Sequence, residues 1–216
     1  MSPQRAPRRP RVGVLAVQGA FAEHAQALSH AGADALEVRR ADALGDVDGL
    51  VIPGGESTTL GLVGGESGLL AAVRSAIDAG LPVFGTCAGL IMLADEVHGG
   101  SPPLIGGLRV RVRRNAYGRQ RASFEAPVSI PVIGPDPFPG IFIRAPWVEA
   151  AGPGVEVLGE LGGRIVAARQ GAILATAFHP ELTADLRIHR VFIDGLRSAG
   201  RSRGADAEGR THVRSQ

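Results

Sequence analysis

The sequence predicts an α/β fold, a single three-layer domain in which helices cover both faces of a mostly parallel central sheet. The first observation is that short apolar runs alternate with helix-like stretches through the first hundred residues. That order produces right-handed crossovers and a parallel sheet. The second is that strand-like runs follow one another without helices after residue 100, which predicts a small antiparallel region. The third is size, since 216 residues with 44% hydrophobic content suit one domain with a substantial core.

The elements of the first half are bounded by glycine, proline and the period of the apolar residues. Buried strands are predicted at 11–17, 35–39, 49–52 and 82–85. Helices are predicted at 20–31 and 88–97, and a further helical stretch after Gly55 is expected to break at Gly64-Gly65 and resume through Ala79.

The second half reads mainly as strands. We expect them at 108–113, 123–130, 141–144 and 172–178, with 155–161 and 164–169 forming a hairpin around Gly162-Gly163. A closing helix is expected at 184–198.

Charge and composition set the domain limits and exclude several functions. Residues 1–10 and 200–216 are rich in Arg and are predicted to be disordered, which leaves 11–199 as the folded domain. The basic character lies largely in these ends, and no basic stripe with stacking aromatics is visible, so we expect no nucleic-acid binding. No apolar run has the length of a membrane span and no signal-type segment is recognisable, so we expect a cytoplasmic protein with no membrane partner.

Two residue types limit the chemistry. The 23 basic residues include no Lys, which excludes a lysine Schiff base and a P-loop lysine on this polypeptide. The single Cys excludes an intrachain disulfide. We expect neither a cofactor nor a metal.

Cys87 lies in Gly85-Thr86-Cys87-Ala88-Gly89, between an apolar strand and a helix. This is the cysteine form of the nucleophile elbow, a sharp turn in which small residues avoid clashes around a strained nucleophile. The Ala88 amide directly follows the nucleophile and is placed to stabilise an oxyanion. The alternative interpretation is a structural Cys beside a glycine-rich turn.

Among the six His, His179 is the candidate base because it directly follows an apolar strand. Residues two apart on an extended segment point the same way, so Glu181 is expected to orient the imidazole. His24 and His30 fall on the first predicted helix, where a solvated or core role is the ordinary interpretation, and His189 falls on the closing helix.

A third loop, Pro53-Gly54-Gly55-Glu56-Ser57, also follows an apolar strand. Its glycines allow close backbone approach to a ligand, and the Gly55 amide is a candidate second oxyanion donor. Ser57 or Thr58 is equally suited to be an ordinary helix cap.

These motifs together resemble the class I, triad-type glutamine amidotransferases, and more closely the glutaminase subunits of the two-component pyridoxal 5′-phosphate synthase. The segments that carry the resemblance are VLAVQG at 14–19, PGGESTT at 53–59, FGTCAG at 84–89, RNAYGRQ at 114–120, FIRAP at 142–146 and FHPELT at 178–183.

The resemblance implies a flavodoxin-like amidotransferase fold and hydrolysis of L-glutamine to glutamate and ammonia through a Cys87 thioester. It implies a hetero-oligomer in which a separate barrel-fold synthase subunit receives the ammonia for vitamin B6 synthesis. It also assigns residues by motif position. The implied catalytic triad is Cys87, His179 and Glu181, and the implied glutamine contacts are Gly55, Glu56, Ser57, Arg114, Ile143 and Arg144.

Other functions stay open at this point. One is a glutaminase subunit that serves another amidotransferase pathway. A second is a cysteine peptidase or deglycase that shares the elbow, and a third is a non-catalytic regulatory subunit.

Overall fold

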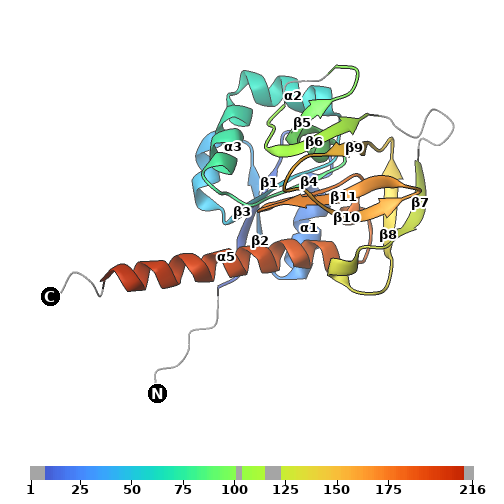
Figure 1. The fold of residues 1–216 in the computed structure, drawn as a ribbon. Coiled ribbons are helices and arrows are strands. Elements are labelled where there is room, and N and C mark those ends of the chain that lie inside the picture. Colours follow the sequence, from blue (N-terminus) through green and yellow to red (C-terminus); the bar gives the residue numbers. More distant parts are fainter. Residues whose placement is uncertain (1–7, 101–103, 115–122, 212–216) are drawn as a thin grey trace.

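The computed structural model describes residues 8–100, 104–114 and 123–211, with residues 200–211 as backbone only (Figure 1). Elements of the chain form a ten-stranded sheet with helices on both faces and a separate two-stranded sheet. The predicted α/β class, with a mostly parallel central sheet and a small antiparallel sheet, is confirmed.

One half of the large sheet is parallel and holds the chain's most buried strands. Its order is β2-β1-β3-β4-β12. The bounds are Arg11–Leu15 for β1, Asp34–Val38 for β2, Gly49–Ile52 for β3, Val83–Thr86 for β4 and Ile173–Thr176 for β12. Every residue of β3, β4 and β12 is buried, as expected of parallel strands covered on both faces. These three neighbours run in the same direction, so the loops that follow them meet at one edge of the sheet.

The other half of the sheet is largely antiparallel and continues through β11, β9, β6 and β5, with β10 paired to β11. The strands are β5 (Ala94–Val97), β6 (Leu108–Arg113), β9 (Trp147–Ala151), β10 (Glu156–Leu161) and β11 (Arg164–Gln170). The predicted hairpin at Gly162-Gly163 is confirmed as β10–β11. Strands β7 (Ser123–Val128) and β8 (Phe138–Ile143) form the small sheet.

Two groups of helices cover the sheet. Helices α1 (Phe21–Ala31) and α5 (Arg187–Thr211) contact each other on one face, whereas α2 (Ser57–Glu66) contacts α3 (Leu69–Asp78) and α4 (Ala88–Leu93) (Figure 1). Short 3-10 turns occupy Ala41–Asp46, Pro131–Ile133 and Pro180–Leu182.

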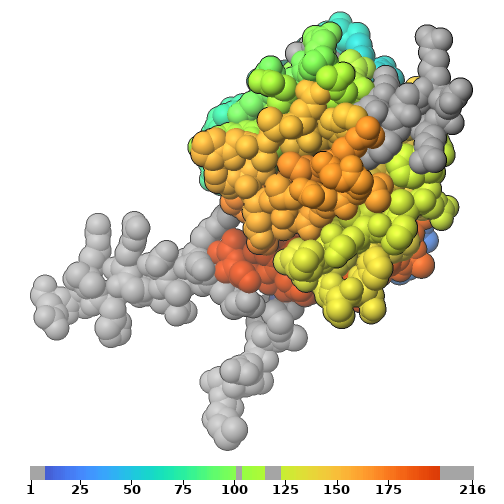
Figure 2. All heavy atoms as spheres, turned by 45° about the vertical axis from the view of Figure 1, so that its right-hand side comes forward, coloured from blue at the N-terminus to red at the C-terminus, as the bar shows by residue number. Residues whose placement is uncertain are grey.

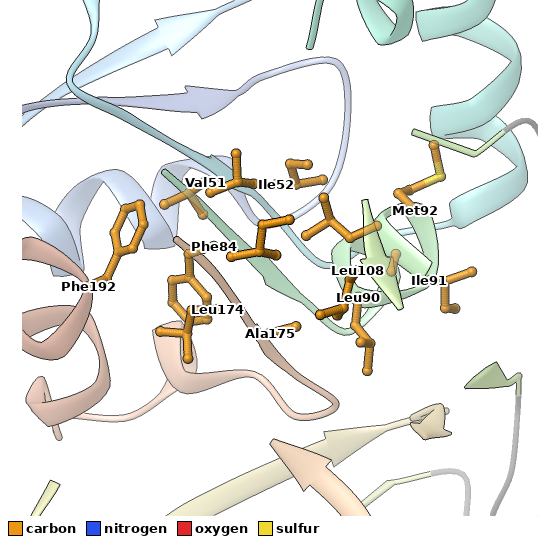
Figure 3. Close-up of a cluster of buried hydrophobic side chains, with 14 of the residues drawn as sticks. Val51, Ile52, Phe84, Leu90, Ile91, Met92, Leu108, Leu174, Ala175 and Phe192 are labelled. Atoms are coloured by element: carbon orange, nitrogen blue, oxygen red, sulfur yellow. The ribbon is translucent and has the colours of Figure 1, made fainter. Parts of the chain in front are cut away.

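The core joins the helices to the buried strands (Figure 3). Phe84 of β4 packs on Phe192 of α5, with ring centroids 5.7 Å apart, and Leu90 of α4 belongs to the same buried cluster. Burying one such side chain contributes about 1.5–3 kcal/mol, so this cluster fixes the strand edge that carries the loops.

The small sheet lies against the antiparallel half. Figure 2 shows the yellow and orange segments, β8 to β11, as one continuous face with α5 passing beneath. A bridge between Ser129 and Glu160 joins the two parts.

Several of the predicted elements require correction. Gly64-Gly65 does not interrupt α2; the break falls at Ser67 and Gly68, where Gly68 adopts φ 70°. The helix predicted at 88–97 ends at Leu93, because Ala94–Val97 pairs with β6 as strand β5.

Strand β9 was not predicted, and α5 begins at Arg187 rather than Ala184, since the Asp185 carboxylate accepts the Arg187 N–H at 3.0 Å. The backbone of α5 also continues past Ser198 to Thr211. Part of the RNAYGRQ motif, 115–120, lies outside the described residues, as do 1–7.

Within the described ranges, no single helix is long and apolar enough to cross a membrane. Helices α2 and α3 pass that test of length and composition only as a pair bent by 93°.

Candidate active site

The turn between β4 and α4 holds Cys87 in a strained conformation. Its backbone has φ 48° and ψ −101°, which costs about 1–3 kcal/mol for a residue with a side chain. The turn is held by the Cys87 N–H, which donates to the Thr176 carbonyl at 2.8 Å. Cys87 is 6% exposed at the sheet edge. The geometry is that of a nucleophile elbow, as the sequence predicts.

The two glycines of the elbow are required by close packing. A Cβ on Gly89 would overlap the Ile52 carbonyl oxygen, and a Cβ on Gly85 would lie 2.6 Å from Cδ1 of Leu93. Strand β3 and helix α4 therefore approach the elbow at backbone contact distance.

His179 and Glu181 follow β12 and form a buried pair. Nδ1 of His179 lies 2.7 Å from Oε1 of Glu181, and each residue is 7% exposed. The His179 N–H donates to the Ile141 carbonyl at 2.8 Å, which fixes the backbone against β8. The predicted proximity of these two residues is present in the structure.

The electrostatics of the pair favour an imidazolium next to a carboxylate. Burial opposes a charge on His179, but hydrogen bonds with Cys87 and Glu181 outweigh it and raise the pKa of His179 to about 10. Burial likewise opposes the Glu181 charge, yet the facing His24 and His179 rings lower the pKa of that carboxyl.

The glycine loop after β3 lies against His179 and Cys87. A Cβ on Gly54 would overlap the His179 ring and lie 3.4 Å from Cβ of Cys87, so only glycine fits. Its peptide groups are fixed from two sides: the Gly54 N–H donates to Oγ1 of Thr86 at 3.0 Å, and the Gly54 carbonyl accepts from the Ala20 N–H at 3.1 Å.

Glu56 is the N-cap of α2. Its carboxylate accepts the Thr58 N–H at 3.2 Å and the Thr59 N–H at 2.8 Å. Desolvation of this carboxyl is outweighed by those hydrogen bonds, which lower its pKa. The sequence alternative in which Ser57 or Thr58 caps the helix is therefore wrong, and Ser57 is instead a buried first-turn residue.

Arg114, which directly follows β6, faces this loop. Its Nη2 lies 3.6 Å from Oε1 of Glu56 and donates to Oγ1 of Thr58 at 3.3 Å. Arg144 has φ 44°, and among the described residues Arg144 and Cys87 are the two non-glycine residues with positive φ. The carbonyl of Ile143 lies 3.8 Å from Sγ of Cys87.

These residues surround one cavity of about 170 Å³. Its lining comprises Gly55, Glu56, Ser57, Cys87, Ala88, Ile91, Arg114, Ile143, Arg144 and His179. Every site residue named from the sequence is in this lining except Glu181, which lies behind His179. Drug-sized ligands occupy about 300–1,000 Å³, so a cavity of this size suits a small metabolite.

Sequence reasoning missed Ile91 in the lining and a buried polar group behind the His179–Glu181 pair. His24 and His189 are fully buried, and Nε2 of His24 lies 3.2 Å from Oε2 of Glu181. The sequence carried no signal for this contact, because it depends on how α1 and α5 pack against the sheet.

Within the described ranges, no group of three or more His, Cys, Asp or Glu is arranged to hold a metal ion.

The fold and these side chains together define a class of protein: an α/β domain with a cysteine elbow facing a His–Glu pair at a small, charged cavity. Comparisons with known proteins agree with that class. Residues 14–198 match the SNO glutamine amidotransferase family. This chain belongs to the SNO glutamine amidotransferase family.

Curated relatives are similar over nearly their full length. The chain is 56% identical over 196 residues to "Pyridoxal 5'-phosphate synthase subunit PdxT" of Frankia casuarinae, covering 90% of this chain and 98% of the relative. It is 54% identical over 191 residues to the protein of the same name from Streptomyces avermitilis, covering 88% and 95%.

Solved structures show the same fold. A crystal structure of a glutamine amidotransferase matches with TM-score 0.82 and 48% identity, covering 86% of this chain and 98% of that one. PurLQS from Thermotoga maritima matches with TM-score 0.63 at 17% identity over 87% and 99% of the two chains, a likeness of fold alone.

Proposed function

We propose that this chain hydrolyses L-glutamine to L-glutamate and ammonia, and that the ammonia serves pyridoxal 5′-phosphate synthesis in a partner synthase subunit. The observation that carries the proposal is the convergence of Cys87, His179 and Glu181 at a small cavity in a chain of the glutamine amidotransferase family. Relatives named as subunits of that synthase, at 54–56% identity, support the pathway.

In this proposal Cys87 and His179 form a thiolate–imidazolium pair. The thiolate attacks the glutamine carboxamide carbon and forms a tetrahedral oxyanion. His179 gives its proton to the departing nitrogen as the tetrahedral intermediate collapses. Ammonia leaves, and a thioester remains on Cys87. His179 then takes a proton from water, which attacks the thioester and releases glutamate.

Glu181 has the role of holding the His179 ring. Its hydrogen bond to Nδ1 leaves Nε2 as the nitrogen that exchanges protons with sulfur, ammonia and water. The elevated pKa of His179 supports an imidazolium in the resting enzyme.

The oxyanion is assigned to the amides of Gly55 and Ala88. Both residues line the cavity beside Cys87, and each such donor contributes about 3 kcal/mol to transition-state stabilisation. The hydrogen bonds on both sides of Gly54 hold the peptide chain that carries the Gly55 N–H.

Substrate recognition is assigned to charges at the cavity wall. The glutamine α-carboxylate suits the guanidinium groups of Arg114 and Arg144, and its α-ammonium suits the Glu56 carboxylate and the Ile143 carbonyl. Ser57 and Gly55 complete the wall around the carboxamide.

The partner is proposed to be a barrel-fold synthase subunit in a cytoplasmic hetero-oligomer. No Lys is present to bind a carbonyl substrate covalently, so the synthesis that uses the ammonia takes place on another chain.

A glutamine-analogue electrophile tests the assignment. The reagent is expected to add one equivalent per copy of this chain in the complex. Peptide mass mapping is expected to place it on Cys87, the single Cys of the chain. Excess L-glutamine should protect the residue, with L-asparagine as the control. An unlabelled Cys87, or labelling that glutamine leaves unchanged, would favour the non-catalytic alternative.

A further inference from the structure

Two buried histidines extend the His179–Glu181 pair into the interior. His24 comes from α1 and His189 from α5, and both are 0% exposed. Nε2 of His24 lies 3.2 Å from Oε2 of Glu181, and Nδ1 of His24 lies 3.2 Å from Nε2 of His189. Oε2 of Glu181 is buried and makes no hydrogen bond among the described residues, so the His24 ring nitrogen 3.2 Å away is a polar group that faces an unsatisfied carboxylate oxygen.

Both rings are neutral at neutral pH. Burial is the main cause that lowers the pKa of His24, and it lowers the pKa of His189 to about 3. Each ring therefore carries one N–H, and the tautomers decide which atom donates to which.

The contacts select one tautomer for each ring. Nε2 of His24 faces a carboxylate oxygen, so a bare lone pair there would be repelled, and the proton belongs on Nε2. Nδ1 of His24 then accepts from Nε2–H of His189. The remaining nitrogen, Nδ1 of His189, is an unprotonated acceptor, and it has no hydrogen-bond partner among the described residues.

The opposite assignment is disfavoured at both ends. It would place a proton on Nδ1 of His189, a buried donor with no acceptor, which costs more than an unused lone pair. It would also turn the lone pair of His24 Nε2 toward the Glu181 carboxylate oxygen 3.2 Å away, even though the Thr86 hydroxyl could donate to that lone pair.

We propose that His24 is a positioning residue of the glutaminase reaction, whose Nε2–H holds the second oxygen of Glu181 while His189 fixes the His24 tautomer. The inference rests on the proposed role of Glu181. In this proposal the attraction between the Nε2–H of His24 and Oε2, 3.2 Å apart, keeps Oε1 directed at Nδ1 of His179.

The same nitrogen of His24 also reaches the glycine loop. Nε2 is hydrogen-bonded to Oγ1 of Thr86 at 3.0 Å, and Oγ1 also accepts the Gly54 N–H at 3.0 Å, so the one Nε2–H faces both Oγ1 of Thr86 and Oε2 of Glu181. His24 therefore links the carboxylate behind the base to the loop that carries Gly55. Helix α1 has a second tie to that loop through the Ala20 N–H.

A matched pair of variants tests the proposal on the complex with the synthase subunit. In His24→Gln the amide nitrogen falls near the place of Nε2 and keeps the donor. In His24→Asn the polar group falls near Nδ1 and the donor to Glu181 is lost. His30→Asn, an exposed change on the same helix, is the control for substitution of a helix histidine.

We expect His24→Asn to lower kcat about ten- to hundredfold, the effect of losing a hydrogen bond to a charged group, with KM for glutamine little changed. His24→Gln should stay within about threefold of wild type, a smaller loss by the same reasoning. Equal losses in both variants, or a rise in KM alone, would overturn the proposal, because a packing role does not distinguish donor position.

The tautomers give a readout that does not depend on activity or on the folding of a variant. In the wild-type protein with ¹⁵N-labelled histidine, long-range ¹H–¹⁵N spectra should show His24 and His189 as neutral Nε2–H tautomers at neutral pH. A neutral Nδ1–H form or a charged ring at His24 would overturn the proposal.

Cys87→Ala distinguishes a failure of the proposed function from a failure of the role given to His24. If wild type and Cys87→Ala release ammonia from glutamine at the same rate, the proposed function fails. If Cys87→Ala is inactive while His24→Asn has wild-type kcat, only the role of His24 fails.

Discussion

Cys87 and His179 show how backbone strain and charge combine at single residues. The positive φ of Cys87 is held by the hydrogen bond of its N–H to Thr176 and by packing around Gly89. This strain directs Sγ into the cavity next to a His whose pKa is raised to about 10. Strained backbone is concentrated at this cavity, since Arg144, which also lines it, has φ 44°.

Glu181→Gln tests the orientation of the base. The amide keeps the size of the side chain but removes the charge that stabilises the imidazolium, so kcat for glutamine hydrolysis should fall by roughly 10²–10⁴. The rate is measured on the complex with saturating glutamine. Glu160→Gln, an exposed residue on β10, is a control expected to leave the rate unchanged. Retention of wild-type kcat by Glu181→Gln would remove Glu181 from the triad.

Arg114→Ala tests substrate binding. Loss of the guanidinium that suits the α-carboxylate should raise KM for glutamine about tenfold or more, since a charge-assisted hydrogen bond is lost, while kcat changes less. Arg111→Ala is the matched control. Arg111 lies on β6, just before Arg114, and the change removes an exposed ion pair with Glu96 of β5. An effect of equal size in both variants would contradict a binding role for Arg114.

Some residues of the site could be read from the sequence and others could not. Cys87, His179 and Glu181 follow apolar strands in short motifs, so their placement depends only on strand direction. His24 could not be assigned, because its contact with Glu181 depends on how α1 crosses the sheet, and a helix histidine alone carries no such information.

At the scale of elements, the elbow depends on close approach of β3 and α4. Gly89→Ala would place a Cβ on the Ile52 carbonyl oxygen and should destabilise the protein by about 1–3 kcal/mol, the cost of overpacking a dense core. Urea unfolding followed by circular dichroism gives the change in the free energy of unfolding.

Gly65→Ala is the control for that substitution. Gly65 lies inside α2 with open space around it, so alanine should raise the free energy of unfolding by about 0.5–1 kcal/mol through better helix propensity. A tolerated alanine at Gly89 would show that the elbow relaxes without the contact with β3.

The errors in the predicted elements have tertiary causes. Ala94–Val97 continues an apolar helix in the sequence, yet it forms β5 because β6 offers a parallel partner. Trp147–Ala151 is a short segment with one buried residue, and it becomes β9 through pairing with β6 and β11. Local pattern does not contain these pairings.

The protein should lose stability in mild acid, because folding lowers the pKa of three buried groups, His24, His189 and Glu181. His189 has its pKa lowered from 6.5 to about 3, so the unfolded chain binds a proton that the folded chain refuses between these values. The Glu181 pKa is also lowered, and its contribution is lost as pH falls below 4.5. Both contributions are present above the unfolded pKa and decline in acid.

We therefore expect the free energy of unfolding to fall from pH 6.5 downward, by about 1.4 kcal/mol per pH unit for each proton taken up. His189→Gln removes one titrating group and keeps a donor toward His24, so its slope between pH 6.5 and 4.5 should be shallower by about one proton. Equal slopes in the two proteins would contradict a buried neutral His189. Urea titrations at fixed pH values provide the comparison.

The most direct measurement of the central claim is ammonia release from L-glutamine by the chain assembled with the synthase subunit, wild type against Cys87→Ala. The proposal predicts glutamate and ammonia in equal amounts from wild type, and a rate for Cys87→Ala that does not exceed that of the synthase subunit alone. Ammonia release by Cys87→Ala at the wild-type rate would contradict it.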